Sequence, residues 1–226
     1  MSDITRDTEE LIDRALREDL ATGDPTTEIL IPADLEGTAT FISKSPGVIA
    51  GVNVALEVFR KIDSSILASV LEKDGTKVDS DIPIAEVRGA IGSILKAERT
   101  ALNFLRRLSG VASETAKYVE KVKGHHVRIV DTRKTTPGLR ALEKYAVRAG
   151  GGHNHRQNLG DGILIKDNHI EALAQFGMSF GDVIRKANSE KSHTINVEVE
   201  VETLTQVKEA LDAGATILLL DNMSIE

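Results

Sequence analysis

Apolar residues recur at helical spacing in three stretches of the first half of the chain. Leu11, Leu16 and Leu20 share one face of a predicted helix, and the segment ATGDPTT (21–27) ends it with a Gly and a Pro. A second helix is predicted over 52–62, and a long apolar stripe predicts a third over 102–122. Gly110 interrupts this stripe, which predicts a kink or a junction between two helices.

The segments between these helices alternate and contain β-branched residues, which favours strands. Residues 36–51 are interpreted as strands around a turn at 45–47, and residues 70–95 as strands with turns at 74–75 and 80–83. Strands and helices mixed in this way predict an α+β domain for the first half of the chain.

In the second half, short strands alternate with helices. The predicted strands are 127–130, 163–165, 195–201 and 217–220, and the predicted helices are 139–148, 171–176 and 204–213. This alternation is typical of parallel β/α units. The predicted class is therefore α/β, with an N-terminal α+β domain over 1–115 and a partial β/α barrel over 116–226.

Each predicted strand of the second half ends in polar residues. The four ends are 131–134, 166–169, 200–202 and 221–222. In β/α barrels, residues at the carboxyl ends of the strands converge on the active site. Because these ends carry Arg, Lys, His, Glu and Asp, they predict one constellation of functional residues.

Composition excludes several classes of protein. The 226 residues include no Cys, which excludes disulfide scaffolds, thiolate metal sites and Cys nucleophiles. With no Trp, two Tyr, five Phe and a net charge of -7, the chain is not expected to bind nucleic acid. The acidic N-terminus does not resemble a signal peptide, and no run approaches the roughly 20 apolar residues that span a bilayer. We therefore expect a cytoplasmic protein that binds no membrane.

Charge is concentrated in one part of this acidic chain. Residues 123–169 contain nine basic and four acidic residues, and five of the six histidines. A cationic segment within an acidic protein indicates a site for an anionic small molecule, although a solvated basic surface would give the same count.

Two loops in the cationic segment offer groups that bind anions. The loop 132–138 carries Arg133 and Lys134, which provide a planar guanidinium fork and a compact charge for carboxylate or phosphate. Its alternative role is to cap the next helix. The glycine-rich loop 150–156 allows the backbone to approach an anion, but it matches no phosphate-binding motif. His153 or His155 could ligate a metal, which we disfavour because no partner ligand stands at a suitable spacing.

The later strand ends carry one lysine and several carboxylates. Lys166 could bind an anion, form a Schiff base, or simply extend its ammonium into solvent. Period-two alternation places Glu198, Glu200 and Glu202 on one face of a strand, where a cation must offset their repulsion. Asp221 could hold hydrated Mg²⁺ or ribose hydroxyls.

Several long motifs resemble the quinolinate phosphoribosyltransferase family, also called nicotinate-nucleotide pyrophosphorylase (carboxylating). They are DTRKTTPGLRALEKYAVRAGGGHNHR from Asp131, ILIKDNHI from Ile163, VEVEVE from Val197 and LLLDNMS from Leu218. The segments RALREDLATGDPTT and LKAERTALNFLRRLSGVAS resemble the family too. The likeness runs from about residue 11 to 224 and implies an α/β N-terminal domain joined to an open, incomplete β/α barrel.

The resemblance implies a pentosyltransferase reaction of NAD biosynthesis. Quinolinate and phosphoribosyl pyrophosphate, with Mg²⁺, would give nicotinate mononucleotide, pyrophosphate and CO₂. The implied substrate-binding residues are Arg99, Thr132, Arg133, Lys134, His155, Arg156, Lys166, Glu200 and Asp221. Of these, Arg133, His155, Arg156 and Lys166 match positions that hold quinolinate.

The same resemblance assigns the phosphoribosyl side and an assembly. Lys134, Glu200 and Asp221 are the implied catalytic residues, facing the phosphoribosyl group and its Mg²⁺, with Glu200 and Asp221 as candidate metal ligands. Arg99 matches an arginine that reaches into the neighbouring subunit's site, which implies a homodimer.

Length conflicts with a complete barrel. A full eight-unit barrel takes about 250 residues, whereas the 99 residues from 128 to 226 allow three to four units. We therefore expect a C-terminally truncated chain that lacks the loops for the 5′-phosphate. The alternatives are an inactive or non-catalytic fragment, a molybdenum-transport-associated relative of the same fold, and a lysine-dependent barrel lyase.

Overall fold

The computed structural model describes residues 4–225, which divide into two compact units between His155 and Arg156. The helices of the first unit are α1 (Arg6–Asp19), α2 (Pro25–Leu30), α3 (Val52–Ile62), α4 (Ile91–Lys121) and α5 (Arg140–Ala149). Because α5 packs on α4, these units do not coincide with the domains predicted at 1–115 and 116–226, and that division stays a prediction. No helix within residues 4–225 is long and apolar enough to cross a membrane.

Short polar side chains cap the first two helices. The Thr5 hydroxyl accepts a hydrogen bond from the backbone N–H of Thr8 at 3.3 Å, and the Asp24 carboxylate accepts one from Thr27 at 3.1 Å. Pro25 is the first residue of α2, a position that proline favours. The sequence pattern had predicted only a break over 21–27, so this helix was not predicted.

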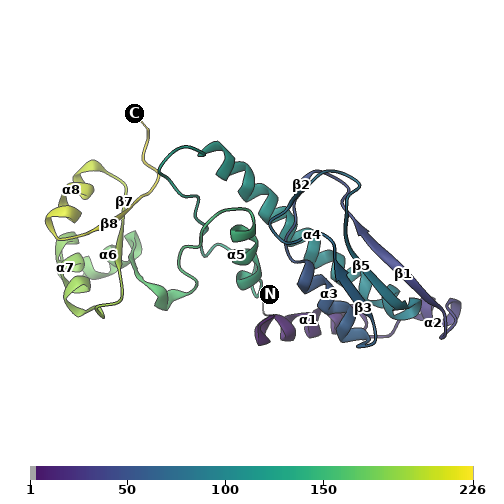
Figure 1. Ribbon diagram of the computed structural model, residues 1–226. Helices are drawn as coiled ribbons and strands as arrows, with labels where there is room; N and C mark the ends of the chain where they lie inside the picture. The colour runs from purple at the N-terminus through teal and green to yellow at the C-terminus, as the bar shows by residue number, and fades with distance from the viewer. Residues whose placement is uncertain (1–3, 226) are drawn as a thin grey trace. The chain divides into compact units, whose positions relative to one another are not determined.

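Antiparallel strands and two long helices form the core of the first unit. The strands β1 (Glu36–Ile42), β5 (Pro83–Ala90) and β3 (Leu67–Val70) pair in the order β1-β5-β3, and β2 (Gly47–Val48) pairs with β4 (Lys77–Val78). Helices α3 and α4 pack on each other and on this sheet (Figure 1). Phe41 and Phe59 meet edge to face with ring centroids 5.6 Å apart, which joins β1 to α3.

Three details of the first unit differ from the sequence-based expectations. Residues 91–95, predicted as strand, form the first turn of α4. Gly110 lies inside α4, so the predicted junction between two helices is wrong, because the apolar stripe packed on α3 and α5 outweighs the roughly 1 kcal/mol helix cost of glycine. The predicted strand 127–130 is only a single parallel bridge between Val130 and His153, because no strand of several residues pairs with it in the described part of the chain.

The second unit is a small parallel β/α sheet. Its strands β6 (Ile163–Ile165), β7 (Val197–Val201) and β8 (Ile217–Leu220) pair in the order β6-β7-β8, which confirms the predicted parallel units. Around them lie the 3₁₀ turn η1 (Leu159–Asp161) and the helices α6 (Asp167–Ala174), α7 (Phe180–Glu190) and α8 (Leu204–Asp212) (Figure 1). The three valines of β7 are buried, so β7 is the centre of this core.

Helix α7 was not predicted from the pattern, although its start carries a clear signal. The Ser179 hydroxyl accepts a hydrogen bond from the backbone N–H of Asp182 at 3.2 Å, and the Asp182 carboxylate accepts one from the backbone N–H of Ser179 at 3.1 Å. Hydrogen bonds from the Ser179 hydroxyl and from Arg185 lower the pKa of Asp182 to about 2.

Candidate active site

Three strand ends of the second unit place a lysine and two carboxylates on one face. Glu200 pairs in register with Leu219, so the alternation puts Asp221 on the same face as Glu200 when the ladder continues. The backbone bond from Asp221 to the Val201 carbonyl, 2.9 Å long, continues that ladder. Lys166 follows β6, and its Nζ lies 3.2 Å from Glu200 Oε2. The parallel sheet therefore brings Lys166, Glu200 and Asp221 to one edge, which joins three of the four strand ends predicted to converge; the fourth, 131–134, belongs to the first unit, and its place in the constellation stays a prediction.

The predicted row of three glutamates is only partly formed. Glu198 and Glu200 are half-buried within β7, but Glu202 lies beyond the strand and is exposed. The expected positive partner is Lys166, whose side chain is 44% exposed while that of Glu200 is 13% exposed. The electrostatic requirement is thus met by a lysine from the neighbouring strand end.

The polar strand end at 166–169 is a helix start. Asp167, Asn168 and His169 form the first turn of α6, and the backbone N–H of Lys166 donates to Nδ1 of His169 at 3.0 Å. Since Nδ1 accepts this bond, a neutral His169 carries its proton on Nε2. His169 therefore orients the backbone of Lys166.

The loop after Asp131 presents cations without protein partners. The Thr132 hydroxyl accepts a hydrogen bond from the backbone N–H of Lys134 at 3.0 Å, which turns the loop. Within residues 4–225, the exposed Lys134 side chain has no ion-pair partner, and Arg133 Nε is buried without a hydrogen-bond acceptor. A buried donor without an acceptor is costly, so Arg133 is suited to receiving an anionic ligand.

Two hydrogen-bonding groups anchor the far end of that loop. Glu143 of α5 accepts from the backbone N–H of Thr136 at 3.1 Å and from Arg107 Nε of α4 at 3.1 Å. Burial alone would raise the pKa of Glu143, but the hydrogen bonds from Arg107 and Thr136 lower it below its ordinary value. Glu143 thus ties the loop 132–138 to α5, although no side chain of this loop caps the helix, and anion binding by Arg133 and Lys134 stays a prediction.

The glycines of the loop 150–156 have a packing role. A Cβ on Gly150 would lie 2.3 Å from the Ala112 carbonyl oxygen of α4, and one on Gly152 would lie 2.8 Å from the Thr115 side chain. Glycine is therefore needed for the close approach of this loop to α4. Close packing against α4 thus explains Gly150 and Gly152, and no bound anion is needed to account for them.

A buried polar cluster that was not predicted from the sequence joins the loops 132–138 and 150–156. Asp131 pairs with Lys144 of α5 and also accepts hydrogen bonds from Asn154 and from the backbone of His155. Lys144 is 1% exposed although Arg140 and Arg148 lie one turn to either side of it on α5, so the sequence pattern gave no signal for this pair.

The remaining predicted cations lie in both units. Arg156 begins the second unit and donates from Nη1 to the Gly162 carbonyl at 2.9 Å, while its Nε is buried without an acceptor among the described residues. Arg99 is exposed on α4 and forms no ion pair within residues 4–225. Thr132, Arg133, Lys134 and His155 belong to the first unit, as does Arg99.

The carboxylates of Glu200 and Asp221 suit a metal ion that is bound mainly by the phosphates of a ligand. In the described part of the chain, no three His, Asp or Glu residues gather into a metal cage. Mg²⁺ commonly binds through one or two carboxylates together with substrate phosphates. Glu200 and Asp221, at adjacent strand ends, fit that mode.

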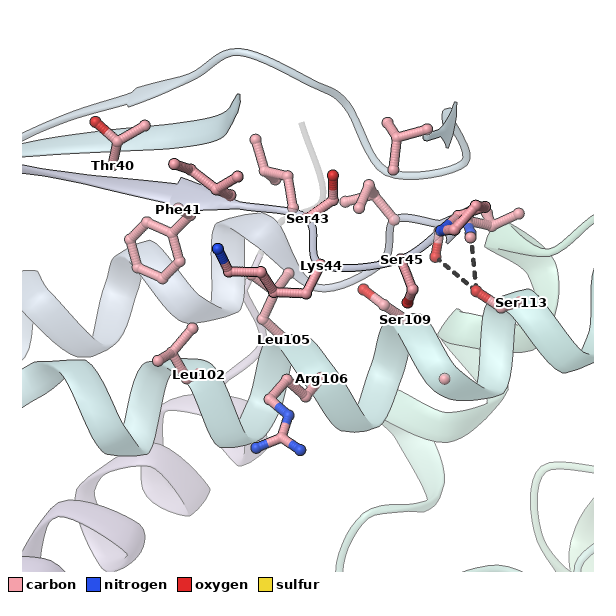
Figure 2. Close-up of a pocket in the computed structure, with 18 of the residues that line it drawn as sticks. Thr40, Phe41, Ser43, Lys44, Ser45, Leu102, Leu105, Arg106, Ser109 and Ser113 are labelled. Atoms are coloured by element: carbon pink, nitrogen blue, oxygen red, sulfur yellow. Dashed lines mark hydrogen bonds between the residues drawn. The ribbon is translucent and has the colours of Figure 1, made fainter. Parts of the chain in front are cut away.

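A separate groove of about 970 Å³ lies in the first unit between the β1–β2 segment and α4. Figure 2 shows Phe41 pointing from β1 toward α4 above Leu102. At its other end, the Ser113 hydroxyl accepts a hydrogen bond from the backbone N–H of Val48 at 2.8 Å. None of the predicted site residues lines this groove, which separates it from the candidate active site.

Models of one protein family match almost the whole chain. The model described as "Quinolinate phosphoribosyl transferase, N-terminal domain" matches residues 24–109, and the model of the C-terminal domain matches residues 111–226.

Curated relatives and solved structures agree with this family. The chain is 42% identical to the probable nicotinate-nucleotide pyrophosphorylase [carboxylating] of Bacillus subtilis, over 94% of this chain and 72% of the relative. It is 44% identical to the Mycobacterium leprae enzyme of that name, over 99% of this chain and 77% of the relative. The crystal structure of NadC from Streptococcus pyogenes matches with a TM-score of 0.92 and 41% identity, over 100% of this chain and 79% of that one.

Proposed function

The chain belongs to the quinolinate phosphoribosyltransferase family, and from that premise we propose that it transfers phosphoribosyl to quinolinate in NAD biosynthesis. The products are nicotinate mononucleotide, pyrophosphate and CO₂. The observation that supports this reaction best is the row of Lys166, Glu200 and Asp221 across three parallel strand ends. The predicted molybdenum-transport-associated alternative is not favoured, because the relatives at about 40% identity carry the pyrophosphorylase name.

Quinolinate is a dicarboxylate and needs donors that recognise two carboxylates. We assign its binding to Arg133, His155, Arg156 and Lys166, with Thr132 ordering the loop. The Nε atoms of Arg133 and Arg156, which are buried without acceptors in the part of the chain that the structure describes, support this assignment. A carboxylate would accept from these guanidinium groups and remove the cost of an unsatisfied donor.

We assign Lys134, Glu200 and Asp221 to the phosphoribosyl side of the reaction. The pyridine nitrogen of quinolinate forms a bond to C1′ as the bond from C1′ to pyrophosphate breaks. Positive charge develops on the ribose and negative charge on the departing pyrophosphate. Glu200 would stabilise the first and Lys134 the second by charges already in place.

Decarboxylation then needs little help from side chains. The alkylated ring nitrogen is cationic, so it stabilises the electron pair left at C2 when CO₂ departs, and a proton at C2 completes the mononucleotide. The role of the protein in this step is to hold the ring and exclude other outcomes.

We propose Mg²⁺ as the cofactor, bound with phosphoribosyl pyrophosphate. Glu200 and Asp221 are the candidate protein ligands, and the metal would supply charge for the leaving pyrophosphate. A cytoplasmic location also stays a prediction.

We propose a homodimer in which Arg99 acts in the neighbouring subunit. Support comes from its exposed position on α4 without an ion pair among the described residues. The test mixes inactive Arg99→Ala and Lys134→Ala subunits and allows them to exchange. If Arg99 acts across the dimer, about a quarter of wild-type activity should return, because half of the dimers are mixed and each has one intact site. No recovery in proven mixed dimers would contradict this role.

The activity itself is tested directly on the full chain. The protein is mixed with quinolinate, phosphoribosyl pyrophosphate and Mg²⁺, and mononucleotide is followed by its absorbance and by mass spectrometry. Release of CO₂ equal to mononucleotide supports the proposal. Absence of product from folded protein that still binds quinolinate would favour the non-catalytic alternative.

A further inference from the structure

Asp131 joins the two loops that carry the predicted cations of the first unit. The side chain of Asp131 is 8% exposed and that of its ion-pair partner Lys144 is 1% exposed. Asp131 Oδ1 accepts from the Lys144 ammonium and from the backbone N–H of His155 at 2.8 Å, while Oδ2 accepts from Asn154 Nδ2 at 2.6 Å. The two carboxylate oxygens thus hold different residues of the loop 150–156: Oδ1 holds the backbone of His155 and Oδ2 holds the side chain of Asn154.

Lys144 also holds the loop 150–156. Its ammonium donates to the His155 carbonyl at 3.3 Å, and its own carbonyl accepts from Asn154 Nδ2 at 2.9 Å. Arg148, one turn further along α5, donates to Asn154 Oδ1. The loop is therefore clamped to α5 through both its backbone and its side chains.

The backbone connects Asp131 and its hydrogen-bond partners to the loop 132–138. The N–H of Asp131 donates to the His153 carbonyl at 3.1 Å, and Asp131 directly precedes the segment that contains Arg133 and Lys134. A shift of Asp131 would move this segment and His155 together.

Stability alone is a weak reason for such a buried pair. Taking two charges out of water costs several kcal/mol, and an apolar pair of similar volume is often as stable or more so. A buried ion pair does, however, impose fixed geometry on every group bonded to it. The geometry is the property that a pocket for a rigid dicarboxylate requires.

We propose that Asp131 and Lys144 are positioning residues that hold the two loops carrying Arg133, Lys134 and His155, and that fix Arg133 and His155 in the arrangement that binds quinolinate. The part concerning quinolinate rests on the proposed function. The part concerning the order of the two loops stands on the hydrogen bonds alone.

Asp131→Asn is the sharpest single change because it keeps the size of the side chain. An amide has one accepting oxygen and one donating nitrogen. If the oxygen faces Lys144 and His155, the amide nitrogen faces the Nδ2 donor of Asn154; in the opposite orientation it faces the Lys144 ammonium. Either orientation places two donors against each other.

Two measurements test the proposal. In Asp131→Asn, hydrogen exchange in peptides covering 132–136 and 153–155 should rise by about tenfold or more. Quinolinate affinity, measured by calorimetry without the second substrate, should fall by about tenfold or more. Val58→Ala, a buried change on α3, is the control for general destabilisation and should leave both loops and the affinity near wild type.

The double variant Asp131→Asn/Lys144→Met separates positioning from a purely structural role. Removing the unpaired charge should bring the melting temperature back toward wild type. Loop protection and quinolinate affinity should stay low, because the bonds to His155 and Asn154 are still lost or mismatched. Recovery of protection and affinity together with the melting temperature would overturn the proposal.

The outcomes keep this inference separate from the proposed function. If wild type neither binds quinolinate nor forms product, the proposed function fails, and the exchange data alone decide whether the pair orders the loops. If wild type is active and Asp131→Asn exchanges and binds like wild type, the positioning role fails while the function stands.

Discussion

Lys166 Nζ and Glu200 Oε2 lie 3.2 Å apart at the carboxyl ends of neighbouring parallel strands. The pair is partly exposed, so its own contribution to stability is below about 1 kcal/mol. Its importance lies in placement, because Asp221 follows directly after the next strand, β8, at the same sheet edge. A cation and two carboxylates side by side can address the oppositely charged parts of one reaction.

Glu200→Gln should impair turnover far more than folding. The change keeps the shape but removes the charge proposed to stabilise the cationic ribose, so kcat should fall by about 100-fold. Unfolding free energy should fall by less than about 1 kcal/mol. Steady-state kinetics and urea unfolding measure the two effects. Glu202→Gln is the matched control, because Glu202 is exposed beyond the end of β7, and it should behave like wild type.

Much of the sheet edge that carries Lys166 and Glu200 could be predicted from the sequence. Period-two burial of the valines of β7 places Glu198 and Glu200 on the opposite face, and parallel β/α alternation aligns the strand ends. The ion pair of Asp131 with Lys144 could not be predicted, because it joins a loop to a helix face only after α5 has packed. The sequence offered an anion-binding reading of Gly150, but close packing against Ala112 explains that glycine.

Lys134→Ala should lower turnover while leaving quinolinate binding almost intact. Lys134 is exposed and without an ion-pair partner within residues 4–225, so its removal should cost no stability. If it stabilises the departing pyrophosphate, kcat should fall by about 100-fold or more, with quinolinate affinity changed less than about threefold. Lys123→Ala removes an exposed lysine of the same cationic segment and serves as the control. Unchanged turnover would contradict a role on the phosphoribosyl side.

Arg133→Met should separate stability from binding. The Nε of Arg133 is buried and has no acceptor within residues 4–225. Such a donor costs about 1–3 kcal/mol, so the apolar replacement should keep or raise stability. Quinolinate affinity should fall by about 100-fold, since a guanidinium–carboxylate pair is lost. Thermal unfolding with and without quinolinate measures both quantities. Arg128→Met, an exposed change nearby, is the control and should be stabilised by quinolinate as much as wild type is. A lower melting temperature of Arg133→Met without ligand would contradict the prediction, because it would show that the Nε of Arg133 has a hydrogen-bond acceptor in solution.

Glu143→Gln should make stability less dependent on pH. Burial opposes ionisation of Glu143, but hydrogen bonds from Arg107 and Thr136 lower its folded pKa below the ordinary 4.5. A carboxyl with a lowered folded pKa contributes stability above its unfolded pKa and loses it as pH falls through the folded pKa. Wild type should therefore exceed the variant by about 1–3 kcal/mol at pH 7, and the gap should close below pH 4.5. Urea unfolding at several pH values measures the gap, with the exposed Glu18→Gln as control; a gap that persists unchanged in acid would show that the charge of Glu143 is not what anchors the loop.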